Sequence, residues 1–115
     1  MTDCIFCKII KGELASNIIF ENDYVVAFPD LNPVARVHVL IVPKIHVTSI
    51  YSLAKHPQRG EIMAAVTEAV AAVADQYKTG EGFRLITNNG EDAGQTVMHL
   101  HFHLIGGEKL PVTIL

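Results

Sequence analysis

Three histidines alternate with apolar residues near the end of the chain, at His99, His101 and His103. Successive side chains of a β-strand point to opposite faces, so an extended segment here would present three imidazole rings on one face. The other face would be apolar and could seal a core, through Met98, Leu100, Phe102 and Leu104. An imidazole titrates near neutrality and can act as nucleophile, acid or base. The pattern therefore predicts a centre for phosphorus chemistry.

Attack of a neutral imidazole on phosphorus would give a phosphoramidate, which water then hydrolyses. The attacking nitrogen must keep its lone pair free, so the other ring N–H needs an acceptor, and a backbone carbonyl would serve. Upstream, residues 94–96 offer amides and side chains that could hold phosphate oxygens. The alternative, a surface strand that happens to carry histidines, does not explain so strict an alternation.

A second chemical motif is the Cys-x-x-Cys pair formed by Cys4 and Cys7. In a cytosolic protein such a pair is a redox couple, half of a metal site or two buried thiols. Because the chain has no further cysteine, a zinc ion would have to take its other ligands from the six histidines. A thiol redox protein is disfavoured, because the expected βαβ context is missing and the three histidines would stay unexplained.

The composition predicts a soluble cytoplasmic protein with a single domain over residues 1–115. Half of the residues are hydrophobic and the formal net charge is -3. The sequence shows no basic stripe of the kind that binds nucleic acid. Its apolar stretches are shorter than the roughly 20 residues that span a bilayer, and no signal-peptide pattern is evident. We therefore expect binding to neither nucleic acid nor membrane.

The elements that must position these residues can be predicted from periodicity and from turn residues. A long helix is expected after Pro57, where apolar residues recur every three or four positions up to Tyr77, with Gly80 as its C-terminal cap. Short helices are expected at 5–11 and 48–53, and strands at 17–20, 24–28, 37–42, 83–87 and 97–105. This order predicts an α+β fold, with a mainly antiparallel sheet of about five strands and the long helix on one face.

Residues 94–105, which read GQTVMHLHFHLI, resemble the signature of the histidine-triad (HIT) family, in which three histidines alternate with hydrophobic residues. Segments 4–10, 27–30, 38–44 and 88–90 also resemble the branch that includes the histidine-triad nucleotide-binding (Hint) proteins. The resemblance covers nearly the whole chain. It implies a HIT-like fold and a homodimer whose two sheets join into one, which binds purine nucleoside monophosphates such as AMP.

The activity that the resemblance implies is hydrolysis of nucleoside phosphoramidates or related nucleotidyl conjugates through a nucleotidyl-histidine intermediate. By position, His101 would be the nucleophile, His103 would lie by the phosphate and the leaving group, and His38 would support them from the neighbouring strand. Asp30 would bind the ribose hydroxyls. The remaining implied contacts are a base pocket of Phe6, Ile9, Phe28 and Leu31 and a phosphate site of Asn88, Gln95 and Thr96.

Most of these residues also have a purely structural interpretation. His38 could be a satisfied core histidine, and the apolar residues of the base pocket could be ordinary core. Asp30 could form an Asx-turn, and residues 88–90 are first of all a turn signal.

The resemblance extends to the metal, since many bacterial relatives of this branch carry an equivalent set of two cysteines and two histidines. It implies a structural zinc bound by Cys4, Cys7, His46 and His99, and buried thiols are the alternative. Four protein ligands would leave no position for substrate. Such a site would tie the N-terminal helix to the segment that carries the nucleophile.

Two other functions stay open at this stage. The chain could be a nucleotide-binding adaptor protein with incidental catalysis, or a dinucleoside polyphosphate hydrolase. Residues 106–115 are short and lack an aromatic residue, in a region where such relatives differ most. The leaving group is therefore not determined by the sequence.

Overall fold

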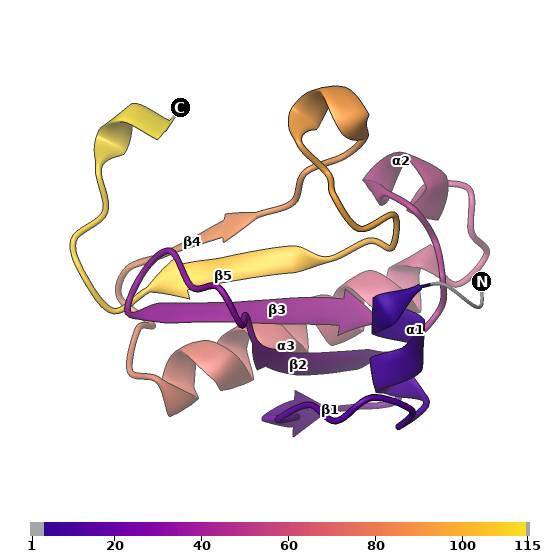
Figure 1. The fold of residues 1–115 in the computed structure, drawn as a ribbon, viewed down its shortest axis with the longest axis horizontal. Coiled ribbons are helices and arrows are strands. Elements are labelled where there is room, and N and C mark those ends of the chain that lie inside the picture. Colours follow the sequence, from indigo (N-terminus) through magenta and orange to yellow (C-terminus); the bar gives the residue numbers. More distant parts are fainter. Residues whose placement is uncertain (1–3, 115) are drawn as a thin grey trace.

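The computed structural model describes residues 4–114 and has the predicted α+β architecture (Figure 1). Five antiparallel strands form one sheet in the order β1-β2-β3-β5-β4. The strands are β1 (Phe20–Glu21), β2 (Val25–Pro29), β3 (Val37–Pro43), β4 (Phe83–Ile86) and β5 (Phe102–Gly106). The helices are α1 (Ile5–Ile10), α2 (Ile50–Leu53) and α3 (Arg59–Gln76), with single 3-10 turns at Glu91–Ala93 and Val112–Ile114.

One face of the sheet packs against α3, which lies behind the sheet in Figure 1. Alternate residues of β2 and β3 point to this side, and the buried face of the helix meets them. The main core consists of Val25, Ala27, Val39, Ile41, Ile62, Val66, Ala69, Val73, Phe102 and Leu104, among others. Within residues 4–114, no helix is both long enough and apolar enough to cross a membrane.

The opposite face of the sheet carries a smaller core under α1, which lies in front of the sheet in Figure 1. The other set of alternating residues in β2 and β3 points here, so Phe6 of the helix packs against Phe28 with ring centroids 5.8 Å apart. The buried members of this cluster are Phe6, Val26, Phe28, Leu40 and Val42. Since the residues of β2 and β3 that face α3 fill the main core, the histidines are left on the α1 face of the sheet.

Two of the predicted element ends are wrong. The strand expected at 17–20 begins only at Phe20. The predicted cap at Gly80 is also wrong, because Lys78 adopts the left-handed conformation (φ 59°) in its place. The N–H of Lys78 donates to Asp75 and that of Thr79 to Ala74, a pattern of bonds that closes a helix in a Schellman motif.

The histidine segment differs most from its prediction. The strand expected at 97–105 is hydrogen-bonded in the sheet only from Phe102 onward, so His99 and His101 precede β5. Opposite them β3 ends at Pro43, which has no N–H to extend the ladder. Met98 is 43 % exposed and does not seal the core, contrary to the prediction. From residue 99 onward the alternation holds, since Leu100, Phe102 and Leu104 join the α3 side.

Candidate functional site

His101 is held by its own backbone neighbourhood. Its Nδ1 lies 2.7 Å from the carbonyl oxygen of His99, which can only accept, so Nδ1 carries the proton and donates. A neutral imidazole has one N–H, so Nε2 keeps a free lone pair. The Phe6 ring and the buried imidazole pack in a T-shaped arrangement with centroids 5.0 Å apart. His101 therefore has the tautomer that a nucleophile attacking through Nε2 requires.

Thr87, which the sequence analysis did not single out, supports the same residue. Its hydroxyl donates to the carbonyl oxygen of His101 at 2.8 Å. Thr87 follows β4, whereas His101 precedes β5, so only the pairing of these strands brings them together. No sequence motif marks this threonine.

His38 and His103 form a hydrogen-bonded pair in which the rings carry their protons on Nε2, whereas His101 carries its proton on Nδ1. The backbone N–H of Val34 donates to Nδ1 of His38 at 3.1 Å, so the proton of neutral His38 is on Nε2. Nε2 of His38 donates this proton to Nδ1 of His103 at 2.9 Å. The same nitrogen lies 3.3 Å from Oδ2 of Asp30. Because Nδ1 of His103 accepts this bond, neutral His103 carries its own proton on Nε2.

Burial keeps both of these rings neutral. Desolvation lowers the pKa of His103 to about 4, helped by repulsion from His101 and His38 and opposed by the Asp30 carboxylate. Desolvation also lowers the pKa of His38, again against the pull of Asp30. The rings of His101 and His103 have centroids 5.1 Å apart. The site therefore pairs a free lone pair on one histidine with an N–H donor on the next.

A cavity of about 430 Å³ lies between α1 and the end of β2, a size common for small-molecule sites. Three of the four residues predicted for the base pocket line it, namely Ile9, Phe28 and Leu31. The fourth, Phe6, does not line it and is buried beneath His101. Leu31 is 93 % exposed, which favours a role other than core packing.

Asp30 follows β2 between Pro29 and Leu31, which line this cavity, and both of its carboxylate oxygens have partners. Oδ1 accepts from the N–H of Asn32 in an Asx-turn at 2.9 Å, and Oδ2 faces His38. The Asx-turn considered for Asp30 from the sequence is thus present. Its second oxygen places a negative charge beside His38 and His103.

Of the three residues predicted to meet the phosphate, Gln95 has a side-chain amide that is hydrogen-bonded within the protein. Its side-chain NH₂ donates to the carbonyl oxygens of Thr48 (2.6 Å) and Val97 (3.0 Å), and its Oε1 accepts from the N–H of Gly90 (2.8 Å). Both donors of the buried amide are used, and in this state its side chain shapes the loop. Thr96 is exposed and Asn88 is half-buried, and the phosphate role of all three residues stays a prediction.

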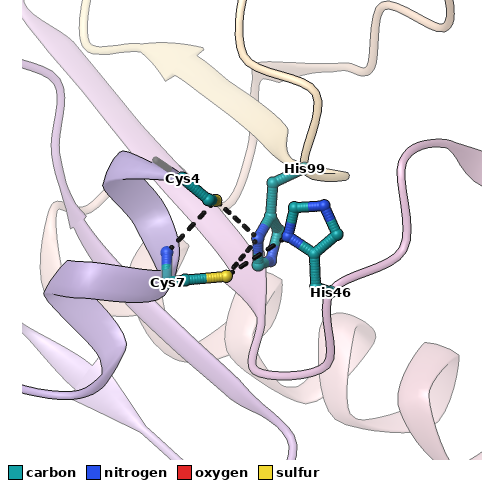
Figure 2. Close-up of side chains that lie close together, drawn as sticks. All are labelled: Cys4, Cys7, His46 and His99. Carbon is teal, nitrogen blue, oxygen red and sulfur yellow. Dashed lines mark hydrogen bonds between the residues drawn. The ribbon is translucent and has the colours of Figure 1, made fainter. Parts of the chain in front are cut away.

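The four predicted metal ligands lie together, although they come from three separate segments (Figure 2). Sγ of Cys4 lies 3.3 Å from Nδ1 of His99, and Sγ of Cys7 lies 3.2 Å from Nδ1 of His46 and 3.6 Å from Nδ1 of His99. All four donor atoms are within 4.8 Å of one another. Both cysteines are partly exposed and His99 is fully buried.

These distances and the donor chemistry fit zinc. In a tetrahedral site with the usual Zn–S and Zn–N bond lengths, sulfur and nitrogen ligands lie about 3.5 Å apart. Nε2 of His99 donates its proton to the carbonyl oxygen of Pro43 at 2.7 Å, which leaves the lone pair of Nδ1 directed at the sulfurs. Bound zinc would supply a structural cross-link, since four protein ligands fill its coordination sphere.

A second group of potential ligands, Asp30, His38 and His103, does not fit a metal. Their donor atoms are also within 4.8 Å of one another. However, Nδ1 of His38 accepts from Val34, so Nε2 carries the proton and has no lone pair for a cation. The hydrogen-bond partners of these histidines thus distinguish the cluster whose donor atoms fit a metal from the cluster whose donor atoms are hydrogen-bonded to one another.

In a comparison with known protein families, residues 11–110 match the family described as HIT domain. The matched region includes all three histidines and the loops around them. It begins after Cys4 and Cys7, so the thiol pair lies outside the part that matches the family.

Solved structures and curated relatives agree with this match. A HIT family hydrolase from Clostridium thermocellum is 44% identical, with a TM-score of 0.92 over 100% of this chain and 99% of that chain. A 14 kDa zinc-binding protein from Zea mays is 39% identical over 92% of this chain and 83% of its own length. Adenylylsulfatase HINT1 from Arabidopsis thaliana is 39% identical over 92% of this chain and 72% of its own length.

Proposed function

The chain belongs to the HIT domain family and has the fold of HIT family hydrolases, and on this basis we propose that it hydrolyses purine nucleoside phosphoramidates or related nucleotidyl conjugates. The observation that carries this proposal is the 2.7 Å hydrogen bond from Nδ1 of His101 to the carbonyl oxygen of His99. It leaves Nε2 as a nucleophile with a free lone pair.

In the first step, Nε2 of His101 attacks the phosphorus atom, and the bond from phosphorus to the leaving group breaks. The resulting nucleotidyl-histidine is cationic, and its Nδ1–H donates a charge-assisted hydrogen bond to the His99 carbonyl. The phosphate charge of the substrate beside His103 raises the pKa of that buried ring, because an anion favours the imidazolium. Protonated His103 carries a proton on both nitrogens, so the Nε2–H of His38 turns from His103 to Oδ2 of Asp30, 3.3 Å away. His103 then gives its Nε2 proton to the leaving nitrogen or oxygen.

In the second step, water attacks the nucleotidyl-histidine. Nε2 of His103, now without its proton, accepts a proton from this water, and the phosphorus–nitrogen bond to His101 breaks. Nε2 of His38 lies 2.9 Å from Nδ1 of His103 and 3.3 Å from Oδ2 of Asp30, which supplies the compensating negative charge. The products are a nucleoside monophosphate and the free leaving group.

The cavity beside Asp30 supports a nucleoside as the bound half of the substrate. Its apolar walls, which include Ile9, Phe28 and Leu31, suit a purine base. Asp30 lies next to Leu31 in the chain, and its carboxylate would bind the ribose hydroxyls. Asn88 and Thr96 would bind the phosphate. The metal cluster of Cys4, Cys7, His46 and His99 would hold a structural zinc ion.

A homodimer is supported by the exposed edge of the sheet at β4. Edge strands carry unpaired N–H and C=O groups and are usually protected by charge, twist or a partner. Here two apolar residues of β4, Phe83 and Leu85, are 36 % and 42 % exposed. Pairing of two such edges would join the sheets of two copies.

The proposal is tested by incubating the protein with adenosine phosphoramidate, and in parallel with adenylyl sulfate, the substrate class named by the Arabidopsis relative. We expect AMP to be released, and His101→Ala to lower kcat by at least about 10³-fold while AMP binding and the circular dichroism spectrum are retained. His56→Ala, which changes a histidine outside the site, serves as the control. Tight AMP binding with no turnover of either substrate would instead support the adaptor alternative.

A further inference from the structure

The proposed nucleophile lies just outside the part of the sheet that is paired. On one side, the pairing of β5 with β3 stops at Phe102, opposite Ile41. On the other side, the pairing of β5 with β4 stops at His103, opposite Ile86. The backbone of His101 therefore lies beyond the last pair on both sides, and contacts other than the ladder must hold it.

Two hydrogen bonds from other segments hold the peptides around this residue. The N–H of Leu100 donates to the carbonyl oxygen of Val47 at 2.7 Å, which fixes the peptide that carries the His99 carbonyl. The hydroxyl of Thr87 donates to the carbonyl oxygen of His101 at 2.8 Å, which fixes the peptide on the other side of the nucleophile. Because the backbone on both sides directs the Cα–Cβ bond, each of these hydrogen bonds helps to direct the ring.

Thr87 is placed to align the two histidines proposed for catalysis. It directly follows Ile86, and Ile86 pairs with His103 in the sheet. Two adjacent residues thus contact the backbone of both histidines, Ile86 through the ladder and Thr87 through its hydroxyl. The rings of His101 and His103 have centroids only 5.1 Å apart. A shift of the His101 peptide would therefore change the distance between the attacking nitrogen and the proton donor.

The threonine itself lies outside the region proposed to bind the nucleoside. Thr87 is half-buried and is not one of the residues that line the cavity beside Asp30. A hydroxyl has one proton to donate, and here the His101 carbonyl takes it. Loss of this hydroxyl should therefore affect the chemical step and not the binding of a nucleotide.

We propose that Thr87 is a positioning residue that sets the direction in which His101 attacks and its alignment with His103. Without the hydroxyl, the carbonyl of a buried residue lacks this partner, which is unfavourable, and the peptide reorients. A misplacement of about 1 Å can cost roughly 10²-fold in rate. The consequence for catalysis rests on the proposed function.

Thr87→Val tests this role, because valine keeps the β-branched shape and removes the hydroxyl donor. We expect kcat with adenosine phosphoramidate to fall about tenfold or more, while the affinity for AMP, measured by titration calorimetry, is unchanged. Thr87→Ser restores the donor and should recover most of kcat. Circular dichroism checks that each variant is folded.

Thr67→Val is a matched control on α3. The hydroxyl of Thr67 also donates to a backbone carbonyl, that of Ala64, at 2.8 Å, and the residue is exposed and away from the histidines. The substitution removes the same kind of hydrogen bond and should leave both kcat and AMP affinity unchanged. An equal fall in kcat in this control would contradict a specific role for Thr87.

A second measurement does not depend on turnover. The imidazole of His101 packs against the Phe6 ring with centroids 5.0 Å apart, so the shifts of its C–H protons depend on its position beside that aromatic ring. These shifts and the carbonyl ¹³C shift of His101 should change in Thr87→Val and return in Thr87→Ser. All spectra are recorded at one pH, so that the protonation of the histidines is not varied.

The inference would be overturned by unchanged kcat in Thr87→Val, by unchanged ring shifts of His101, or by a fall in kcat that Thr87→Ser does not recover. Failure of the proposed function would look different, since the unchanged protein would then turn over neither substrate. The ring and carbonyl shifts would still decide in that case whether Thr87 positions His101.

Discussion

At the residue scale, the partner of one ring nitrogen decides what the other nitrogen can do. Nε2 of His99 donates to Pro43, so Nδ1 is available to the sulfurs. Nδ1 of His101 donates to a carbonyl, so Nε2 is available for attack. Nδ1 of His38 accepts from Val34, so Nε2 donates to His103. Three histidines thus take three roles although their side-chain chemistry is the same.

The low pKa of His103 makes the stability of the fold depend on pH. Its pKa is about 4 in the folded chain, against about 6.5 in an unfolded one. As the pH falls below 6.5, the unfolded state takes up this proton first, so the free energy of unfolding decreases until the pH reaches about 4. For this group the loss amounts to at most about 3 kcal/mol. Urea unfolding at a series of pH values measures it.

His103→Asn should remove this contribution and flatten the decline between pH 6.5 and 4. His56→Asn, which removes a histidine outside the network, should keep it. Both variants retain the metal cluster, so protonation of the cluster affects them equally. An unchanged pH dependence in His103→Asn would contradict the assignment.

At the element scale, α1 is tied to the rest of the molecule by the cysteines at its beginning and by the small core beneath it. The helix has only six residues, too few to be stable alone. Phe6 and the contacts from Cys4 and Cys7 to the two histidines hold it against the sheet. Since Ile9 of this helix lines the cavity, the cluster also shapes the proposed base pocket.

Metal analysis of the purified protein should therefore give about one zinc ion per chain. Cys4→Ser combined with Cys7→Ser should abolish binding and lower the free energy of unfolding by several kcal/mol, because zinc binds the folded state alone. His56→Ala, which changes a histidine outside the cluster, should keep the full metal content. Zinc that persists in the double variant would disprove the ligand assignment.

The end of α3 offers a test of local backbone strain. Lys78 lies in the left-handed region, which costs a non-glycine residue roughly 1–2 kcal/mol. We expect Lys78→Gly to raise the free energy of unfolding by about 1 kcal/mol, less than the full strain because glycine gains entropy in the unfolded state. Urea denaturation measures the change. Lys78→Ala keeps the strain, and an equal gain in this control would show that the backbone is not the cause.

At the scale of the whole molecule, the sheet separates two functions between its faces. The α3 face holds the larger core and stabilises the fold. The α1 face holds the histidines, the cavity and the metal cluster. The edge of the sheet at β4 belongs to neither face and is where we propose contact with a second copy.

Light scattering should accordingly show a dimer in solution, and Leu85→Lys should convert it to a monomer by placing charges on both sides of the paired edges. Tyr51→Lys replaces a more exposed apolar residue on α2 (73 %, against 42 % for Leu85) and should remain dimeric. Circular dichroism checks that both variants are folded. A monomer at tens of micromolar unchanged protein would contradict the proposed assembly.

The sequence by itself determined the groups that can react and the class of fold. The alternation of histidine with apolar residues, the Cys-x-x-Cys pair and the helical stripe after Pro57 are local patterns, because strand and helix periodicity act over a few residues. The resemblance to the HIT family added the prediction of which residues would bind a metal. The antiparallel α+β architecture followed from the order of the elements.

Only the tertiary structure decided which atoms face one another. Cys4 and His99 are 95 positions apart and His38 and His103 are 65 apart, so no local pattern encodes these contacts or the tautomers that they select. No local pattern encodes the hydrogen bond from the side chain of Gln95 to the carbonyl oxygen of Thr48 either. The same is true of the point beside Pro43 at which the hydrogen-bonded pairing of β5 with β3 stops. Such contacts depend on how separate segments pack, and packing determines here which nitrogen of each histidine keeps its lone pair.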